Sequence, residues 1–123
     1  RVGALAGMAY VSGLAILTFV APQYYHYALY VEVEGGLKLI LDYKSGLVVT
    51  IDQQEIDTKK ESYEKKGKVE KIEYREGLTW STIRKAVEST ETWRHGVLPG
   101  RKHCRDFVDH IEKHCNGKPE VIG

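Results

Sequence analysis

YHYALYVEVE, residues 25–34, is the stretch that decides the fold of this chain. Its odd-numbered positions are aromatic or aliphatic and its even-numbered positions are mostly polar or small. This period of two, rich in aromatic and β-branched residues, predicts a β-strand. Gly35 and Gly36 follow and predict a two-residue turn. Residues 37–43 are then expected to return as a second strand, so the sequence predicts a β-hairpin.

Further strands are predicted on both sides of this hairpin. Residues 14–20 form an apolar run that ends before Pro22, which lacks the N–H group that a central strand needs. A turn at residues 44–46 leads into a predicted strand over residues 47–51. Residues 69–75 predict a further short strand.

Helices are predicted mainly in the last third of the chain. Thr79 or Ser81 is a typical N-cap for a helix that ends at about residue 90. A final helix is predicted from about residue 102 to residue 113 or 115. Its apolar positions follow the i, i+3, i+4, i+7 spacing of one helix face.

The polar, lysine-rich residues 52–68 are predicted to be a solvent-exposed excursion. An alternative is a basic edge that touches anionic lipid, although acidic residues in the same stretch cancel most of its charge. Taken together, the patterns predict an α+β fold, in which an antiparallel sheet packs against helices.

The bulk composition bounds the classes of protein to which the chain can belong. With 123 residues, 42% of them hydrophobic, it is expected to form a single domain over residues 1–123, with an apolar N-terminal extension at residues 1–13. Its 18 basic and 17 acidic residues give a net charge of +1. RNA is therefore not indicated as a partner, because phosphate binding needs a clear basic excess.

The compartment is predicted from the cysteines and from the uncharged stretch at residues 3–21. Cys104 and Cys115 would lie about 16 Å apart on one helix, too far for a disulfide. Two free thiols indicate a reducing, cytoplasmic location. The uncharged stretch could be a membrane span or a signal-peptide core. Because small residues and Pro22 interrupt it, a buried strand is the preferred interpretation.

Cys104 is the first residue of chemical interest. It lies in the first turn of the predicted final helix, where the helix dipole and the neighbouring Arg101, Lys102 and Arg105 favour thiolate over thiol. The simpler interpretation is a small buried apolar residue, as free cysteines usually are. His26, early in the predicted strand 25–34, is the second candidate, although a lone histidine on a strand is usually structural.

Two short runs link these residues to a known family. Residues 25–31, YHYALYV, resemble the H-box of the lecithin:retinol acyltransferase-like (H-box/NC) family, typically His-Trp-Ala-(Leu/Ile)-Tyr. Residues 103–108, HCRDFV, are similar to that family's NC box, typically Asn-Cys-Glu-His-Phe-Val. The two boxes also occur in the family's order and spacing, and the resemblance covers about residues 14–113.

The resemblance implies a circularly permuted papain-like (NlpC-type) fold and a thiol-dependent reaction. In active relatives the cysteine is the nucleophile and the histidine is its base. They form a thioester with a lipid acyl chain and pass the acyl group to water or to another lipid. On this basis Cys104 would be the nucleophile and His26 the general base.

Two positions depart from the family's pattern. Active relatives carry a second histidine on the strand after the H-box, whereas Asp42 is the only acid on strand 37–43 here, and no histidine lies there. Glu32 and Glu34, on the His26 strand, are further acids that could support the imidazole. His103 stands where the family has asparagine.

Two functions follow from the resemblance and its departures. The missing second histidine favours an H-box/NC module with weak or no catalysis, which binds host proteins or replication partners. Some picornavirus polyproteins release such modules, and a chain that begins at Arg1 fits a processed viral product or a trimmed chain equally. The retained His26 and Cys104 favour a lipid acyl hydrolase or acyltransferase, for which a membrane surface would be a partner.

A metal site is the remaining alternative. His110 and His114 have the i, i+4 spacing of two ligands on one helix face. Cys104, however, would lie about 280° around the helix from His114. We therefore expect neither a metal ion nor a cofactor.

Overall fold

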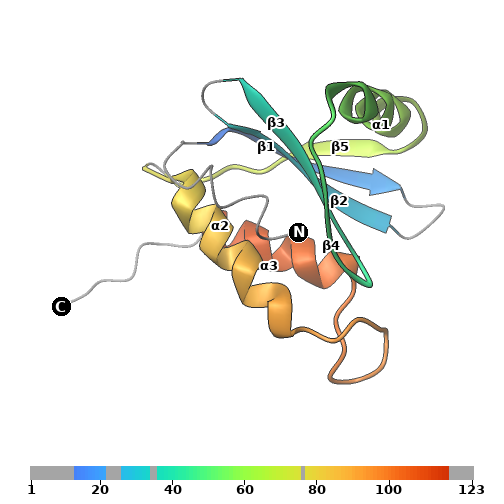
Figure 1. Ribbon diagram of the computed structural model, residues 1–123, viewed down its shortest axis with the longest axis vertical. Helices are drawn as coiled ribbons and strands as arrows, with labels where there is room; N and C mark the ends of the chain where they lie inside the picture. The colour runs from blue at the N-terminus through green and yellow to red at the C-terminus, as the bar shows by residue number, and fades with distance from the viewer. Residues whose placement is uncertain (1–12, 22–25, 34–35, 76, 117–123) are drawn as a thin grey trace.

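A five-stranded antiparallel sheet forms the centre of the computed structural model, which describes residues 13–21, 26–33, 36–75 and 77–116 (Figure 1). The strands are β1 (Gly13–Ala21), β2 (His26–Val33), β3 (Leu37–Lys44), β4 (Gly46–Thr50) and β5 (Lys68–Lys71). Their order in the sheet is β4-β3-β2-β1-β5. The first four strands therefore pair with their neighbours in sequence, and β5 crosses over to pair with β1 at the far edge.

Helices cover both faces of this sheet. They are α1 (Gln53–Lys66), α2 (Trp80–Glu88), the short 3₁₀ helix η3 (Ser89–Thr92) and α3 (Cys104–Asn116). In Figure 1, α1 lies on one side of the sheet and α2 and α3 lie together on the other. The α+β class and the antiparallel sheet packed against helices are thereby confirmed.

The face under α2 and α3 holds the larger apolar core. Trp80 and Ile83 of α2, with Phe107 and Ile111 of α3, are fully buried against the strands. Tyr43 of β3 stacks on Phe107 with ring centroids 5.8 Å apart. The 3.6-residue periodicity of both helices explains this packing, since it places the apolar positions on one stripe.

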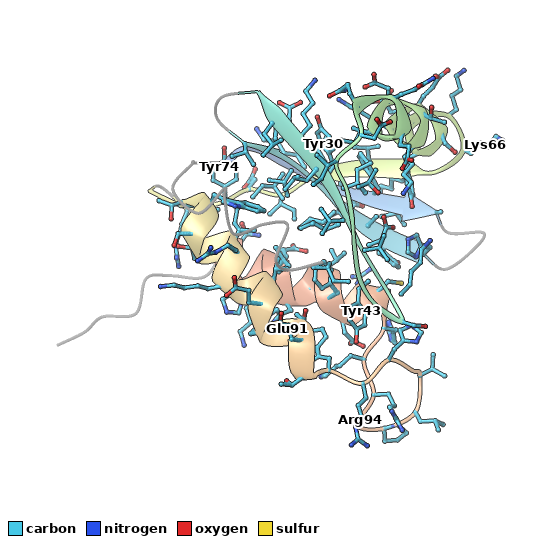
Figure 2. All side chains as sticks on the ribbon, in the orientation of Figure 1. Tyr30, Tyr43, Lys66, Tyr74, Glu91 and Arg94 are labelled. Atoms are coloured by element: carbon cyan, nitrogen blue, oxygen red, sulfur yellow. The ribbon has the colours of Figure 1, made fainter. Side chains whose placement is uncertain are left out.

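The face under α1 holds a smaller core. Its buried members are Phe19, Ala28, Tyr30, Ile40 and Ile56. Phe19 stacks between two tyrosines, with its ring centroid 5.5 Å from that of Tyr30 and 4.8 Å from that of Tyr63. Figure 2 shows Tyr30 beneath α1, whereas Tyr43 lies toward α3.

The predicted excursion at residues 52–68 needs correction, because most of it is the helix α1. Its side chains are largely exposed, as expected, but Ile56 is buried in the core. Asp52 caps the helix by accepting a hydrogen bond from the Glu55 N–H at 3.0 Å. A helix with so little apolar surface gives almost no periodic signal, which is why the sequence pattern did not predict it.

The other predicted elements are present with shifted ends. β5 is shorter than the predicted strand over 69–75, and α3 begins at Cys104 rather than near residue 102. The helix predicted to end at about residue 90 ends at Glu88 and continues as η3. The apolar extension at residues 1–13 lies almost wholly outside the described residues. Within the part of the chain that the structure describes, no helix is long and apolar enough to cross a membrane.

Gly67 fixes α1 against the sheet. It follows the last turn of α1 and donates its N–H to the Tyr63 carbonyl at 3.0 Å. A Cβ atom at this position would overlap the Val20 carbonyl oxygen near the end of β1. Only glycine allows this close approach, so the carboxyl end of α1 is held beside the end of β1 and the beginning of β2.

Candidate functional site

His26 and Asp42 form the centre of the candidate site. Asp42 of β3 pairs in register with Ala28, two residues beyond His26 on β2. Side chains two residues apart on a strand share a face, so both His26 and Asp42 project toward α1. The Nε2 atom of His26 lies 2.7 Å from Asp42 Oδ1, a distance for a charge-assisted hydrogen bond.

The hydrogen bond to Asp42 sets the tautomer of a neutral His26. A carboxylate only accepts, so the ring carries its proton on Nε2 and leaves the Nδ1 lone pair to act as a base. The His26 side chain is 23% exposed and that of Asp42 is 5% exposed. The carboxylate therefore supports the ring from the buried side, while the ring stays accessible.

Lys59 of α1 contacts the same carboxylate. Its Nζ atom lies 3.7 Å from Asp42 Oδ2 and donates a hydrogen bond to Thr50 Oγ1 at 3.0 Å. Asp42 Oδ2 is buried and has no hydrogen-bond partner among the described residues, so the Lys59 ammonium group supplies it with electrostatic support. The Asp42 carboxylate thus contacts His26 through Oδ1 and Lys59 through Oδ2.

Tyr63 of α1 lies in the surroundings of His26 and Asp42. Burial, with a smaller contribution from the Asp42 charge, raises the pKa of the Tyr63 hydroxyl to about 12. Tyr63 also lines the cavity beside His26.

A cavity of about 430 Å³ opens beside the imidazole. The end of β1, the hairpin of β2 and β3, and the second half of α1 form its walls. The lining residues are Ala21, His26, Asp42, Lys44, Lys59, Ser62, Tyr63, Lys66 and Gly67. Three lysines and one aspartate among them give this cavity a positive balance, which suits a ligand that carries negative charge.

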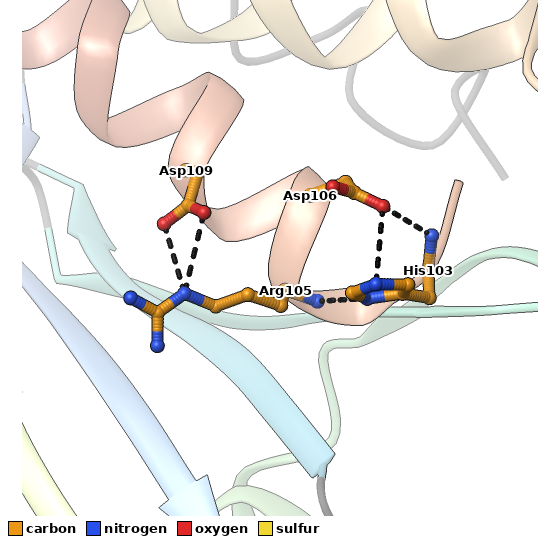
Figure 3. A network of polar contacts seen from close by, with 4 residues as sticks. All are labelled: His103, Arg105, Asp106 and Asp109. Carbon is orange, nitrogen blue, oxygen red and sulfur yellow. Dashed lines mark hydrogen bonds and ion pairs between the residues drawn. The ribbon is translucent and has the colours of Figure 1, made fainter. Parts of the chain in front are cut away.

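The start of α3 is held by a reciprocal cap around His103 (Figure 3). The His103 N–H donates to Asp106 Oδ2 at 2.9 Å, and the Arg105 N–H donates to His103 Nδ1 at 3.3 Å. A capping box satisfies the helix start in the same way, although serine or threonine usually takes the first position. His103, the departure from the family's asparagine, therefore acts as the N-cap that places Cys104 at the first helical position.

Arg105 holds the start of α3 against the start of β2. Its guanidinium carbon lies 4.8 Å from the centre of the Tyr27 ring, and its Nε donates to both oxygens of Asp109 at 3.0 and 3.2 Å. Cys104 precedes Arg105 and His26 precedes Tyr27, so this contact joins the immediate neighbours of the two predicted site residues. Figure 3 shows the Arg105–Asp109 pair beside the cap.

The two residues of the predicted pair belong to different elements, His26 to β2 and Cys104 to α3. His26 projects toward α1, and α3 packs mainly on the opposite face with Cys104 at its first residue. The Tyr27–Arg105 contact joins the sequence neighbours of the two residues. A direct contact between Cys104 Sγ and the His26 ring stays a prediction.

Sequence reasoning left three participants unassigned. Asp42 was one of three acids considered for His26, and the strand register selects it: Glu32 instead accepts a hydrogen bond from the Tyr30 hydroxyl at 2.6 Å. Lys59 and Tyr63 were missed because they belong to α1, which was not predicted as a helix. The Asp52 cap and Gly67 at its two ends were the signals that could have located it.

The remaining cysteine and histidines of α3 have structural surroundings. Both cysteines are free thiols, and Cys115 is fully buried, which raises its pKa to about 11. The His110 Nε2 atom contacts Ser89 Oγ at 2.8 Å and the Ala86 carbonyl oxygen at 3.0 Å, and burial lowers its pKa. In the described parts of the chain, no three histidine, cysteine or acidic side chains gather as a metal-binding group.

Comparisons with known proteins do not assign this chain to a family. No protein-family model, no curated protein and no solved structure matches the chain significantly.

Proposed function

We propose that this chain is a cysteine-dependent acyl hydrolase or acyltransferase with an H-box/NC, permuted papain-like site. Cys104 is the nucleophile, His26 is its general base and Asp42 is the positioning residue. The observation that carries the proposal is the 2.7 Å contact between His26 Nε2 and Asp42 Oδ1. Through this contact Asp42 would orient the His26 imidazole, which is the role of the second histidine in active relatives.

The proposed reaction uses this arrangement in two balanced steps. His26 Nδ1 takes the Cys104 thiol proton, and the thiolate attacks the acyl carbonyl carbon of an ester. The C–S bond forms, the bond to the leaving alcohol breaks, and the imidazolium returns the proton to that alcohol. Water or a second alcohol then attacks the thioester with help from His26 and releases the acyl group and the free thiol. Asp42 stabilises the imidazolium in both steps.

The cavity beside His26 favours an acyl donor that carries an anionic group. Lys44 and Lys66 line it together with Lys59, and the Tyr63 ring forms part of its apolar wall. A phosphate or carboxylate near these ammonium groups would hold an ester next to the imidazole. A phospholipid, as the resemblance implies, has this chemistry.

A second candidate function, the binding module with weak or no catalysis, is favoured by the Lys59 contact. An ammonium group 3.7 Å from Asp42 Oδ2 competes with the imidazolium for the same negative charge. If this competition dominates, His26 and Asp42 are structural, and the H-box/NC domain serves host or replication partners.

The test is a search for the acyl-enzyme. The full chain is incubated with a phospholipid or with an activated short-chain acyl ester, and intact-protein mass spectrometry follows the mass of the product. We expect one acyl group on Cys104, and we expect Cys104→Ser and His26→Ala to abolish it. Cys115→Ser is the matched control, because it removes the second thiol far along the same helix and should leave the adduct unchanged.

The two functions give opposite results. An adduct that forms on Cys115, or on neither cysteine, contradicts the acyl-transfer proposal. If the folded His26→Ala and Cys104→Ser variants also bind partners as the parent chain does, the binding module is the better description.

A further inference from the structure

The loop between η3 and α3, residues 93–103, combines positive charge with an apolar tip. Its sequence, WRHGVLPGRKH, holds no acidic residue. Arg94 stands before the tip, and Arg101 and Lys102 stand after it; all three are exposed. Val97 and Leu98 form the tip itself. In Figure 1 this loop projects beyond the ends of α2 and α3, and Figure 2 shows Arg94 in it.

Val97 and Leu98 are unusually exposed for aliphatic residues. Val97 is 87% exposed and Leu98 is 70% exposed. Of the described residues, the other large hydrophobic side chains that reach the surface are Val48 and Ile51, at 37% and 43%. Adjacent aliphatic side chains held in water are costly, and such a feature marks an interaction site when the backbone keeps them there.

The loop backbone is fixed by its own hydrogen bonds. The Gly96 N–H donates to the Lys102 carbonyl at 2.9 Å, and the Lys102 N–H donates to the Arg94 carbonyl at 2.8 Å. At the tip, the Arg101 N–H donates to the Leu98 carbonyl at 2.9 Å across a turn with Pro99 and Gly100 at its centre. Gly100 has a φ of 83°, as the third position of a type II turn requires. These hydrogen bonds close the backbone of the loop around the exposed pair Val97 and Leu98.

The base of the loop is also attached to the domain. The Lys102 ammonium lies 5.5 Å from the centre of the Trp93 ring, and Tyr43 of β3 contacts both Trp93 and His95, with ring centroids 5.8 Å apart in each case. The base of the loop is therefore packed against the domain, and the exposed tip extends from it into the solvent.

We propose that residues 94–102 dock this protein on an anionic membrane surface. Val97 and Leu98 would enter the boundary between headgroups and acyl chains, while Arg94, Arg101 and Lys102 remain at the level of the lipid phosphates. A single-stranded nucleic acid would be served by aromatic stacking platforms rather than by two aliphatic side chains. The charge pattern, cations on both sides of an apolar pair and no acid among them, is complementary to a negatively charged lipid surface.

The docking site leads directly into α3. Lys102 is two residues from Cys104, and the His103 cap joins the loop to the helix. A protein docked through this loop would turn toward the membrane the end of the sheet where Tyr43 of β3 contacts the loop. The inference does not depend on catalysis, because it is argued from the exposure, charge and closure of the loop alone.

Vesicle flotation of the full chain tests the proposal. We expect binding to vesicles of phosphatidylcholine with added phosphatidylserine, weak binding to phosphatidylcholine alone, and loss of binding in strong salt. Val97→Asp and Leu98→Asp should abolish it, and Arg101→Gln or Lys102→Gln should each weaken it about fivefold. Ile51→Asp, at an exposed aliphatic residue elsewhere, and Lys71→Gln, on β5, are the matched controls and should bind as the parent does.

Insertion of the tip is measured with a Leu98→Trp variant. Lipids brominated in the acyl chain should quench its fluorescence more strongly than that of the parent chain, in which Trp80 is buried and Trp93 lies at the base of the loop. Binding that survives both tip substitutions overturns the proposal, because another part of the chain then holds the membrane. Equal binding to neutral and anionic vesicles overturns it as well, and so does the same loop-dependent affinity for single-stranded RNA. Cys104→Ala should bind normally, so failure of the acyl-transfer proposal would leave this result unchanged.

Discussion

The two faces of the sheet differ in what their side chains do. Under α2 and α3 the contacts are almost all apolar, and large buried residues such as Trp80 and Phe107 fill the space. Under α1 the apolar cluster is small, and the same face holds the His26–Asp42 pair, Lys59 and a cavity. The face under α2 and α3 therefore supplies most of the stability of the fold. The face under α1 has fewer apolar contacts and holds the polar groups instead.

The largest expected effect is loss of turnover without loss of fold on the α1 side. Asp42→Asn should lower thiol-dependent acyl transfer about 10³-fold, because an amide can hold the imidazole in the wrong tautomer and cannot stabilise its positive charge. Thermal unfolding should change little in comparison, since Lys59 can turn its ammonium group to water. Ester turnover and circular dichroism melting measure the two quantities.

Asp57→Asn on the exposed surface of α1 is the control for this substitution, since it removes the same charge away from the imidazole. Turnover that survives Asp42→Asn at parental levels would show that the carboxylate is structural.

The second prediction compares stability across the two faces. Phe107→Ala should lower the free energy of unfolding by about 3–5 kcal/mol, because the ring is fully buried and stacks on Tyr43. Ile56→Ala, in the small cluster, should cost about 2 kcal/mol, because α1 can settle toward the sheet and reduce the cavity that the substitution leaves. Urea unfolding of both variants provides the comparison. A larger cost at Ile56 than at Phe107 would reverse the assignment of the two faces.

The third prediction compares the two ends of α3. Cys115 has a pKa of about 11 because it is buried, so near neutral pH it holds on the order of 100-fold less thiolate than an ordinary cysteine. Cys104 is only partly buried. A limiting amount of an alkylating reagent should therefore label Cys104 first, as peptide mass mapping would show. In denaturant both thiols should react alike, and equal labelling of the native chain would refute the difference.

The smallest expected effect concerns the cap of α3. Asp106→Ala removes the acceptor for the His103 N–H and should cost about 1 kcal/mol of stability, the usual cost of a lost cap. Asp109→Ala, one turn later, removes only the exposed pair with Arg105 and should cost less. Denaturant unfolding resolves the two. Turnover of the Asp106→Ala variant should also fall if the cap positions Cys104.

The contrast between the two faces of the sheet also explains which helices and strands the sequence predicted. The alternation in residues 25–34 and the spacing of Phe107, Val108 and Ile111 predicted the hairpin and the last helix, because burial on one face leaves a regular period. α1 buries little more than Ile56, so its pattern was too weak to distinguish a helix from a polar excursion.

The site was predictable only in part for a related reason. His26 and Cys104 were chosen by their residue types and by the resemblance, which order along the chain can support. The partner of His26 depends on strand register, which places Asp42 opposite Ala28, and no local pattern distinguishes it from Glu32. The cap by His103 depends on side-chain geometry at one helix turn, where serine or threonine would have been the recognisable signal.

The pairing of His26 with Asp42 also has a consequence for the order in which the chain matures. These residues lie 16 positions apart in a single hairpin, so their contact can form as soon as β2 and β3 have left the ribosome. Cys104 is the first residue of α3 and is synthesised after the hairpin. Under the proposed function, acyl chemistry would therefore begin only after α3 has docked on the sheet, later than the His26–Asp42 contact forms.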